Sequence, residues 1–291
     1  MKNKIFYLTL RRFIRHRMAL AGLVIFTVIL ILVAGAPLFS GGDPFAQDLK
    51  NRFQPISSDH WMGTDDLGRD MWTRVLYGGR ISLSVGLLAM LVSIVVGSLV
   101  GLISGFYGGW ADSILSRITE IFLSIPRLFV LIALGMLLRT AEIPFLKAGS
   151  FTPIALVIGA LSWMSVARLV RGATLELRQR EFIVAARCIG AKGNRIMLRH
   201  ILPNVFSPII VSATLGLAGA IISESGLSYL GFGVQLPTPT WGNMLSNTQN
   251  QITTAPWTVI FPGMSIFIAV IAINYIGDGL RDALDPKYYM K

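Results

Sequence analysis

Charged residues are scarce in this chain of 291 residues. Asp, Glu, Lys and Arg make up 14% of it, whereas soluble domains are usually about 25% charged. The charges are also missing in blocks, because none occurs in the ranges 18–42, 81–111, 148–167, 201–223 and 225–277. A membrane-spanning helix needs about 20 predominantly apolar residues. The sequence therefore excludes an ordinary soluble domain and predicts an all-α polytopic membrane protein.

Motifs for catalysis and cofactor binding are absent as well. The chain has no G-x-x-x-x-G-K-[ST] phosphate-binding loop, so we expect any ATP and its Mg²⁺ to be bound by other subunits. No HExxH, Ser/His or paired-carboxylate arrangement lies at membrane depth, and His16, His60 and His200 are scattered. The sequence therefore predicts a non-catalytic protein with no catalytic residues, cofactor or metal of its own.

Cysteine is limited to Cys188, which excludes a disulfide framework within the chain. It has no second Cys or His at metal-ligand spacing, so we expect a packing role. The group His60, Asp65, Asp66 and Asp70 lacks the alternating acidic spacing of a calcium loop. Turn-forming and helix-capping roles are expected instead, and these are compatible with a docking surface for an external protein.

Basic residues, in contrast, are abundant, and the formal net charge is +11. Nucleic-acid binding would be one explanation in a soluble protein, but in a membrane protein Lys and Arg gather in cytosolic segments. Residues 1–17 carry six Lys/Arg and no acid. We therefore expect a cytosolic N-terminus and no nucleic-acid partner.

The chain is predicted to have six transmembrane helices with both termini in the cytosol. Five of them lie in the charge-free blocks, and the third contains Arg117, Glu120 and Arg127. The external segments are 43–80, 139–150 and 224–256, the last of them dipping partly back, and the cytosolic ones include 168–200 and 278–291. Segment 168–200 has eight Lys/Arg against two Glu, and burying eight such residues in lipid would cost roughly 24 kcal/mol. The predicted helices are 18–39, 81–107, 114–138, 151–167, 201–223 and 257–277.

The cytosolic segment predicts a short amphipathic helix over 181–190. Phe182, Ala185, Ala186 and Ile189 recur at helical spacing, whereas Arg180, Val184 and Arg187 lie on another side. Gly190 suits the helix end, Asn194 can cap a following helix, and Pro203 would kink it. Two roles remain open for this helix: lying on anionic lipid, or docking on a cytosolic protein.

The stretch "AARCIGAKGNRIMLRHILPN" resembles the EAA loop of the membrane subunits of bacterial ABC importers. The residues in register with that pattern are Ala185, Ala186, Gly190, Leu202 and Pro203. Val184 replaces the glutamate and His200 replaces an isoleucine of the pattern. Both departures are usual in the branch that imports peptides and nickel, and the first puts in doubt any ATPase contact that relies on the acid.

Three further stretches resemble the same branch: His60–Arg80, Gly226–Leu245 and Asn274–Lys287. The resemblance implies a type I importer permease fold in the bacterial inner membrane, with a basic tail 1–17, a helix and external segment 18–79, a transmembrane domain 80–281 and a tail 282–291. It also implies a second permease subunit, two ATP-binding subunits, an extracytoplasmic solute-binding protein and surrounding membrane lipid. The ATPase-coupling residues would be Glu181, Phe182, Ala185, Ala186, Arg187, Ile189, Gly190 and Ala191.

Other positions are candidates for packing or for the translocation path. Gly97, Gly101 and Gly105, with Gly109, recur every fourth residue and would let another helix approach closely. A helix starting near Ile114 places Arg127 about 20 Å into the membrane. There it would line the path and attract a carboxylate of the cargo, or else pair with Glu120 or snorkel. Glu224 would belong to an external gate or be a solvated helix end.

An ion-driven secondary transporter is the alternative function, but it needs buried ion ligands at paired broken helices. A membrane-embedded enzyme is a third. Co-purification of an ATPase separates the importer from both. The cargo stays open between dipeptides, oligopeptides and nickel complexes, and the lack of a His- or Cys-lined intramembrane site favours peptides.

Overall fold

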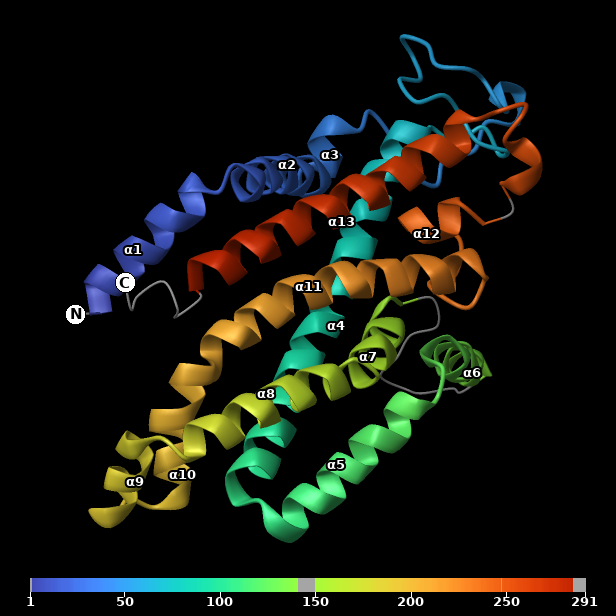
Figure 1. Cartoon of the computed structure of the whole chain (residues 1–291). Helices are drawn as coiled ribbons and strands as arrows, with labels where there is room; N and C mark the ends of the chain where they lie inside the picture. Colours follow the sequence, from blue (N-terminus) through green and yellow to red (C-terminus); the bar gives the residue numbers. More distant parts are fainter. Residues whose placement is uncertain (1, 141–149, 247, 285–291) are drawn as a thin grey trace.

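The structure is a computed structural model that describes residues 2–140, 150–246 and 248–284, and its regular elements there are helices. Figure 1 shows an elongated bundle with two distinct ends. One end, the α9 end, carries the short helices α9 (Glu181–Cys188) and α10 (Gly193–Ile196). The other, the α12 end, carries the segment 40–70 and α12 (Trp241–Met244).

Five helical segments of the described chain are long and apolar enough to cross a membrane, and a bent pair adds a sixth. The bent pair is α5 (Gly109–Ser124) and α6 (Arg127–Thr140). The order of the six agrees with the predicted six-helix arrangement. The five segments are α2 (Arg17–Ala34), α4 (Met71–Tyr107), α7 (Thr152–Ala160) with α8 (Trp163–Arg178), α11 (Leu202–Tyr229) and α13 (Trp257–Leu284).

Several spans are longer than the charge-free blocks indicated. Helix α4 begins at Met71, because the Asp70 carboxylate accepts the Thr73 N–H at 2.8 Å and caps the helix there. Part of the predicted external segment 43–80 is therefore helix. Helix α8 continues to Arg178 and takes up the start of the predicted loop 168–200. Charged side chains can extend a helix beyond its apolar part at low cost once they reach water.

The structure also differs from the prediction next to the first helix and within the third. The predicted basic tail 1–17 contains a helix, α1 (Lys2–Arg15), and a short α3 (Ala36–Phe39) follows α2. The predicted third helix, 114–138, is broken into two helices, because α5 and α6 meet at 88°. Pro126 lies at the break and disfavours helical conformation at Ile125, which is extended. The predicted external segment 139–150 lies mainly outside the described residues.

The core of the bundle is the seam between α4 and α8. Gly97, Gly101 and Gly105 all face α8, where an added Cβ would lie 2.6 to 2.9 Å from a backbone oxygen. Only glycine permits such an approach, so these residues pack within the chain. Gly109 has no such neighbour and, like Gly108, has a positive φ at the turn into α5.

The loop between α11 and α13 returns into the bundle at the α12 end, as the predicted dipping segment implies. Thr240 caps α12 through a reciprocal bond with Asn243, and this turn delivers Trp241 to the core with 1% of its surface exposed. The Trp241 Nε1–H donates to the Val75 carbonyl at 2.9 Å. Helices α4, α11, α12 and α13 are thereby joined at this end.

Candidate functional site

The first candidate site is α9, which protrudes from the α9 end (Figure 1). Ile183 and Ala186 anchor it, since both are buried in one cluster with Leu102 and Phe106 of α4 and Val170 of α8. The helix stops as predicted at Gly190, whose φ is +81°. The N–H of Gly190 donates to the Arg187 carbonyl and the N–H of Ala191 to that of Ala186, which is a Schellman motif.

Apolar side chains form part of the exposed surface of α9. Phe182 and Ile189 are 44% and 86% exposed, and Ala185 is exposed between them. Ala186, which was predicted on the same side, differs from these three because it is buried with Ile183 against the bundle. Cys188 is also exposed rather than packed. An uncovered apolar patch on a protruding helix is typical of a protein contact.

The base of α9 is tied to the end of α4. The Arg187 guanidinium lies 5.5 Å from the centroid of the Phe106 ring, a cation–π distance. The Tyr107 hydroxyl donates to Asn194 Oδ1 at 3.1 Å. Asn194 therefore does not cap the next helix as predicted, and Lys192 occupies the cap position of α10. These contacts fix α9 and α10 to the end of α4.

The connection from α10 to α11 is a π-helical turn over Met197–Ile201, directly before Pro203 in the first turn of α11. Proline supplies no N–H to the helix ladder, and a π turn is a common way to absorb the mismatch. Ile196 and Ile201 are buried in the same cluster as Ile183. At the position of the predicted kink, the chain therefore changes from a π-helical turn to the α-helix α11.

The second candidate site is a cleft of about 740 Å³ between α8, α11 and the start of α6. Arg127, the first residue of α6, donates from Nη2 to Ser162 Oγ at 2.7 Å, and Ser162 in turn donates to the Ile158 carbonyl. The pairing with Glu120 that was considered from sequence is wrong, because Glu120 lies near Arg117 instead, at 3.7 Å. Arg127 thus reaches the cleft through the helix break, and not from the middle of a straight helix.

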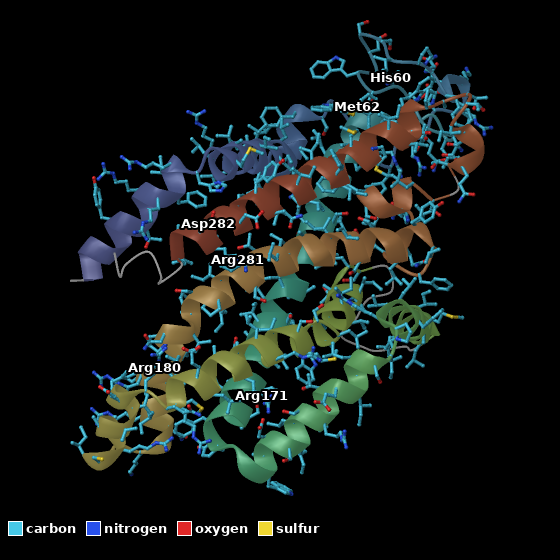
Figure 2. All side chains as sticks on the ribbon, in the orientation of Figure 1. His60, Met62, Arg171, Arg180, Arg281 and Asp282 are labelled. Atoms are coloured by element: carbon cyan, nitrogen blue, oxygen red, sulfur yellow. The ribbon has the colours of Figure 1, made fainter. Side chains whose placement is uncertain are left out.

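Hydroxyl and amide groups line much of this cleft, and a second arginine joins them. Arg281 lies near the α9 end of α13, on the side of α11 (Figure 2). The sequence analysis placed Arg281 in the predicted cytosolic tail 278–291 and did not predict it as a residue of the cleft. Its position one helical turn beyond Gly277 could have indicated that the last helix continues. The polar lining residues are Ser93, Ser162, Ser165, Asn204, Ser207 and Ser212.

Glu224 lies elsewhere, at the α12 end, and is fully buried. Its two carboxylate oxygens accept the hydroxyls of Ser82 at 3.0 Å and Ser228 at 2.7 Å. Those hydroxyls accept the N–H groups of Trp241 and Val234. The expectation of a solvated helix end is therefore wrong, because α11 continues past Glu224 and the carboxylate joins α4, α11 and the α12 loop.

The acidic group near the start of α4 has the structural roles predicted for it. Asp70 caps α4 and also contacts His60 Nδ1 at 3.0 Å. Asp65 pairs with Arg69 at 2.6 Å and with the buried Arg74 at 3.4 Å. These bonds fold segment 40–70 against the α12 end.

Comparisons with known proteins agree with this arrangement. Residues 97–289 match the family described as binding-protein-dependent transport system inner membrane component. Residues 5–55 match the N-terminal transmembrane domain of oligopeptide transport permease C.

Curated relatives are similar along nearly the whole chain. The dipeptide transport system permease protein DppC of Alkalihalophilus pseudofirmus is 43% identical, covering 94% of this chain and 87% of the relative. The oligopeptide transport system permease protein OppC of Bacillus subtilis is 41% identical, covering 95% and 88%. A putative peptide permease protein of Brucella suis is 40% identical, covering 95% and 89%.

Among solved structures, an inward-facing form of the MetNI methionine ABC transporter has a similar fold, with a TM-score of 0.57 at 21% identity. The match covers 74% of this chain and 98% of that one. The family match spans most of the chain, and several described helices can cross a membrane. The chain therefore belongs to the family of inner membrane components of binding-protein-dependent transport systems, as a permease subunit of an ABC importer.

Proposed function

We propose that this permease subunit imports dipeptides or oligopeptides together with a second, related permease subunit, two cytosolic ATPase subunits and an extracytoplasmic solute-binding protein. The names of the relatives support the cargo class. The lack of a phosphate-binding loop in the sequence supports ATP binding by partner subunits. In this arrangement the α9 end and both termini are cytosolic, in agreement with the excess of Lys/Arg in 1–17 and 168–200.

The observation that carries the proposal is the two-sided environment of α9. Its inner side is fixed to the bundle through Ile183 and Ala186, and its outer side presents Phe182, Ala185 and Ile189. An ATPase bound to the outer side would move α9, and the packed inner side would pass that movement to α4, α8 and α11. Coupling needs such a physical connection between two arrangements of the bundle.

The coupling role is tested by altering each side of α9 separately. Ala185→Asp places a charge on the exposed side, so the complex should assemble less well or lose ATP-driven uptake, whereas the thermal stability of the subunit stays unchanged. Gly190→Pro cannot adopt φ of +81°, because proline fixes φ near −65°. This variant should hydrolyse ATP without uptake. Exposed Gly172 of α8, replaced by Ala, is the control.

The outcomes are read in proteoliposomes that contain the whole assembled transporter. ATPase co-purification, ATP hydrolysis and peptide uptake are measured on the same preparation. Normal uptake by both Ala185→Asp and Gly190→Pro would contradict the coupling role of α9. Failure of any ATPase to co-purify with the unaltered chain would contradict the importer assembly itself.

The cleft lined by Arg127 and Arg281 is our candidate for this subunit's share of the translocation path. Two guanidinium groups and several hydroxyls suit a carboxylate, because arginine binds carboxylates through paired N–H donors. Glu224 is buried away from this cleft, so its contribution to the path would be as part of an external gate. The cargo and the cleft would meet only when the gate opens.

The path role is tested with Arg127→Met and Arg127→Lys at equal expression. Met removes the charge and should lower uptake about tenfold, roughly the value of one charged hydrogen bond, whereas Lys should retain part of it. The loss should shrink for a peptide whose terminal carboxylate is amidated. Unchanged uptake by Arg127→Met and Arg127→Ala would remove Arg127 from the path.

A further inference from the structure

Helix α1 has an apolar stripe that the rest of the described chain leaves uncovered. Tyr7, Leu10 and Ile14 are 62%, 44% and 52% exposed. Their spacing of three and four residues places them on one side of the helix. Three exposed large side chains in a row on a helix need an apolar neighbour, because burying them from water is favourable.

A basic stripe runs beside the apolar one. Arg11 and Arg15 are four residues apart on the adjacent row of α1, and both are exposed. Neither has an ion-pair partner among residues 2–140, 150–246 and 248–284. The sequence has no acidic residue before Asp43, so α1 itself carries only basic charges.

The remaining side of α1 fixes the helix beside the membrane-spanning part. Phe13 packs with Ala19 of α2 and Ala283 of α13. The Nδ1 atom of His16 accepts the Ala19 N–H at 3.1 Å, and Nε2 lies 3.5 Å from Asp282. Because the membrane span α2 begins at Arg17, the end of α1 lies at the membrane surface.

We propose that α1 is an interfacial helix that binds anionic phospholipids. Tyr7, Leu10 and Ile14 would enter the boundary between headgroups and acyl chains, and Arg11 and Arg15 would bind headgroup phosphates. An apolar face bordered by arginines is the pattern of helices that bind anionic membranes. Each arginine near such a surface strengthens binding about fivefold. The occupant is a lipid surface, since the helix continues into a membrane span.

The test uses the assembled transporter with Cys188→Ser, which removes the only cysteine. A single cysteine at Ile14, or in a second preparation at Leu10, carries an environment-sensitive fluorophore. The transporter is reconstituted in phosphatidylcholine alone or mixed with phosphatidylglycerol. We expect a blue-shifted emission, quenched by brominated acyl chains, that grows with the phosphatidylglycerol fraction. A label at Ile189 is the control for a protein-facing position, and a label at Val95 is the control for a lipid-facing position.

Charge variants separate lipid binding from a structural role. Arg11→Gln with Arg15→Gln should weaken binding to phosphatidylglycerol-containing bilayers about 25-fold, from about fivefold per arginine, seen as weaker quenching at each phosphatidylglycerol fraction. Arg11→Lys with Arg15→Lys keeps both charges and should behave nearly as the unaltered chain. Quenching that ignores both lipid composition and charge would overturn the proposal. A label at Ile14 that is shielded only when the ATPase subunits are present would overturn it too, in favour of a protein partner.

Discussion

The two ends of the bundle hold their ionisable groups in different ways. At the α12 end, Glu224 is fully buried and is held by neutral serine hydroxyls, each backed by a backbone N–H. Toward the α9 end, Arg171 of α8 points toward α5 (Figure 2) and donates to Asp112 at 2.5 and 2.7 Å. That pair keeps 35% and 18% of its side-chain surface exposed.

This difference indicates different mechanical roles for the ends. A buried carboxylate bound by three chain segments holds those segments in one arrangement, because losing any donor leaves a buried polar group unpaired. A partly exposed ion pair is weaker and can be replaced by water. The α12 end is therefore built as a closed, internally satisfied unit, and the α9 end as a surface that a partner can complete.

Helix α4 joins the two ends, so breaking its seam with α8 should have the largest effect. Gly101→Leu would place a Cβ 2.6 Å from the Ala167 carbonyl oxygen and 2.7 Å from Val170 Cβ. Backbone cannot yield as a side-chain tip can, and overpacking costs about 3 kcal/mol or more. We expect little folded protein, measured as the monodisperse fraction after detergent extraction.

The matched control is Gly172→Leu on the partner helix α8. An added Cβ at Gly172 meets nothing within 4 Å, and its side is exposed. It should extract like the unaltered chain. Equal yields for Gly101→Leu and Gly172→Leu would show that the seam is looser than these distances indicate, and the two ends would then not be rigidly joined.

The second-largest loss of stability should come from substitutions of Glu224. Replacement by alanine leaves the hydroxyls of Ser82 and Ser228 without their acceptor in a buried place, and should cost about 3 kcal/mol. Replacement by glutamine keeps the volume and an acceptor oxygen, so it should cost clearly less. Thermal unfolding of the purified complex measures both. A loss with glutamine equal to that with alanine would show that the negative charge, and not hydrogen bonding, holds this end.

The sequence predicted the six spans, the place of α9 and its stop at Gly190, because these depend on local pattern. Charge-free runs report lipid exposure, and a glycine after a short amphipathic run reports a helix end. The glycine repeat at 97, 101 and 105 likewise predicted close helix packing, although it did not name α8 as the neighbour.

The environment of Glu224 and Arg127 could not be predicted from local pattern. Ser82 in α4 donates a hydrogen bond to Glu224, and the Ser82 hydroxyl itself accepts the N–H of Trp241 in the loop that returns to the bundle. Arg127 reaches Ser162 only because α6 turns 88° away from α5. Such contacts join residues far apart in the chain, and the single sequence carries no periodic signal for them.

The smallest effect should come from the ion pair toward the α9 end, and its salt dependence sharpens the contrast between the ends. Asp112→Asn removes the charge that accepts both Arg171 bonds. A partly exposed pair with this geometry contributes about 1 kcal/mol. We expect a lower midpoint of thermal unfolding by a few degrees at low salt, and a smaller difference at high salt because ions screen exposed charges. Glu224→Ala should show the same loss at both salt concentrations, since its carboxylate is out of contact with solvent. Equal salt dependence in the two variants would contradict the distinction between a buried, internally satisfied end and an end that remains open to solvent and partners.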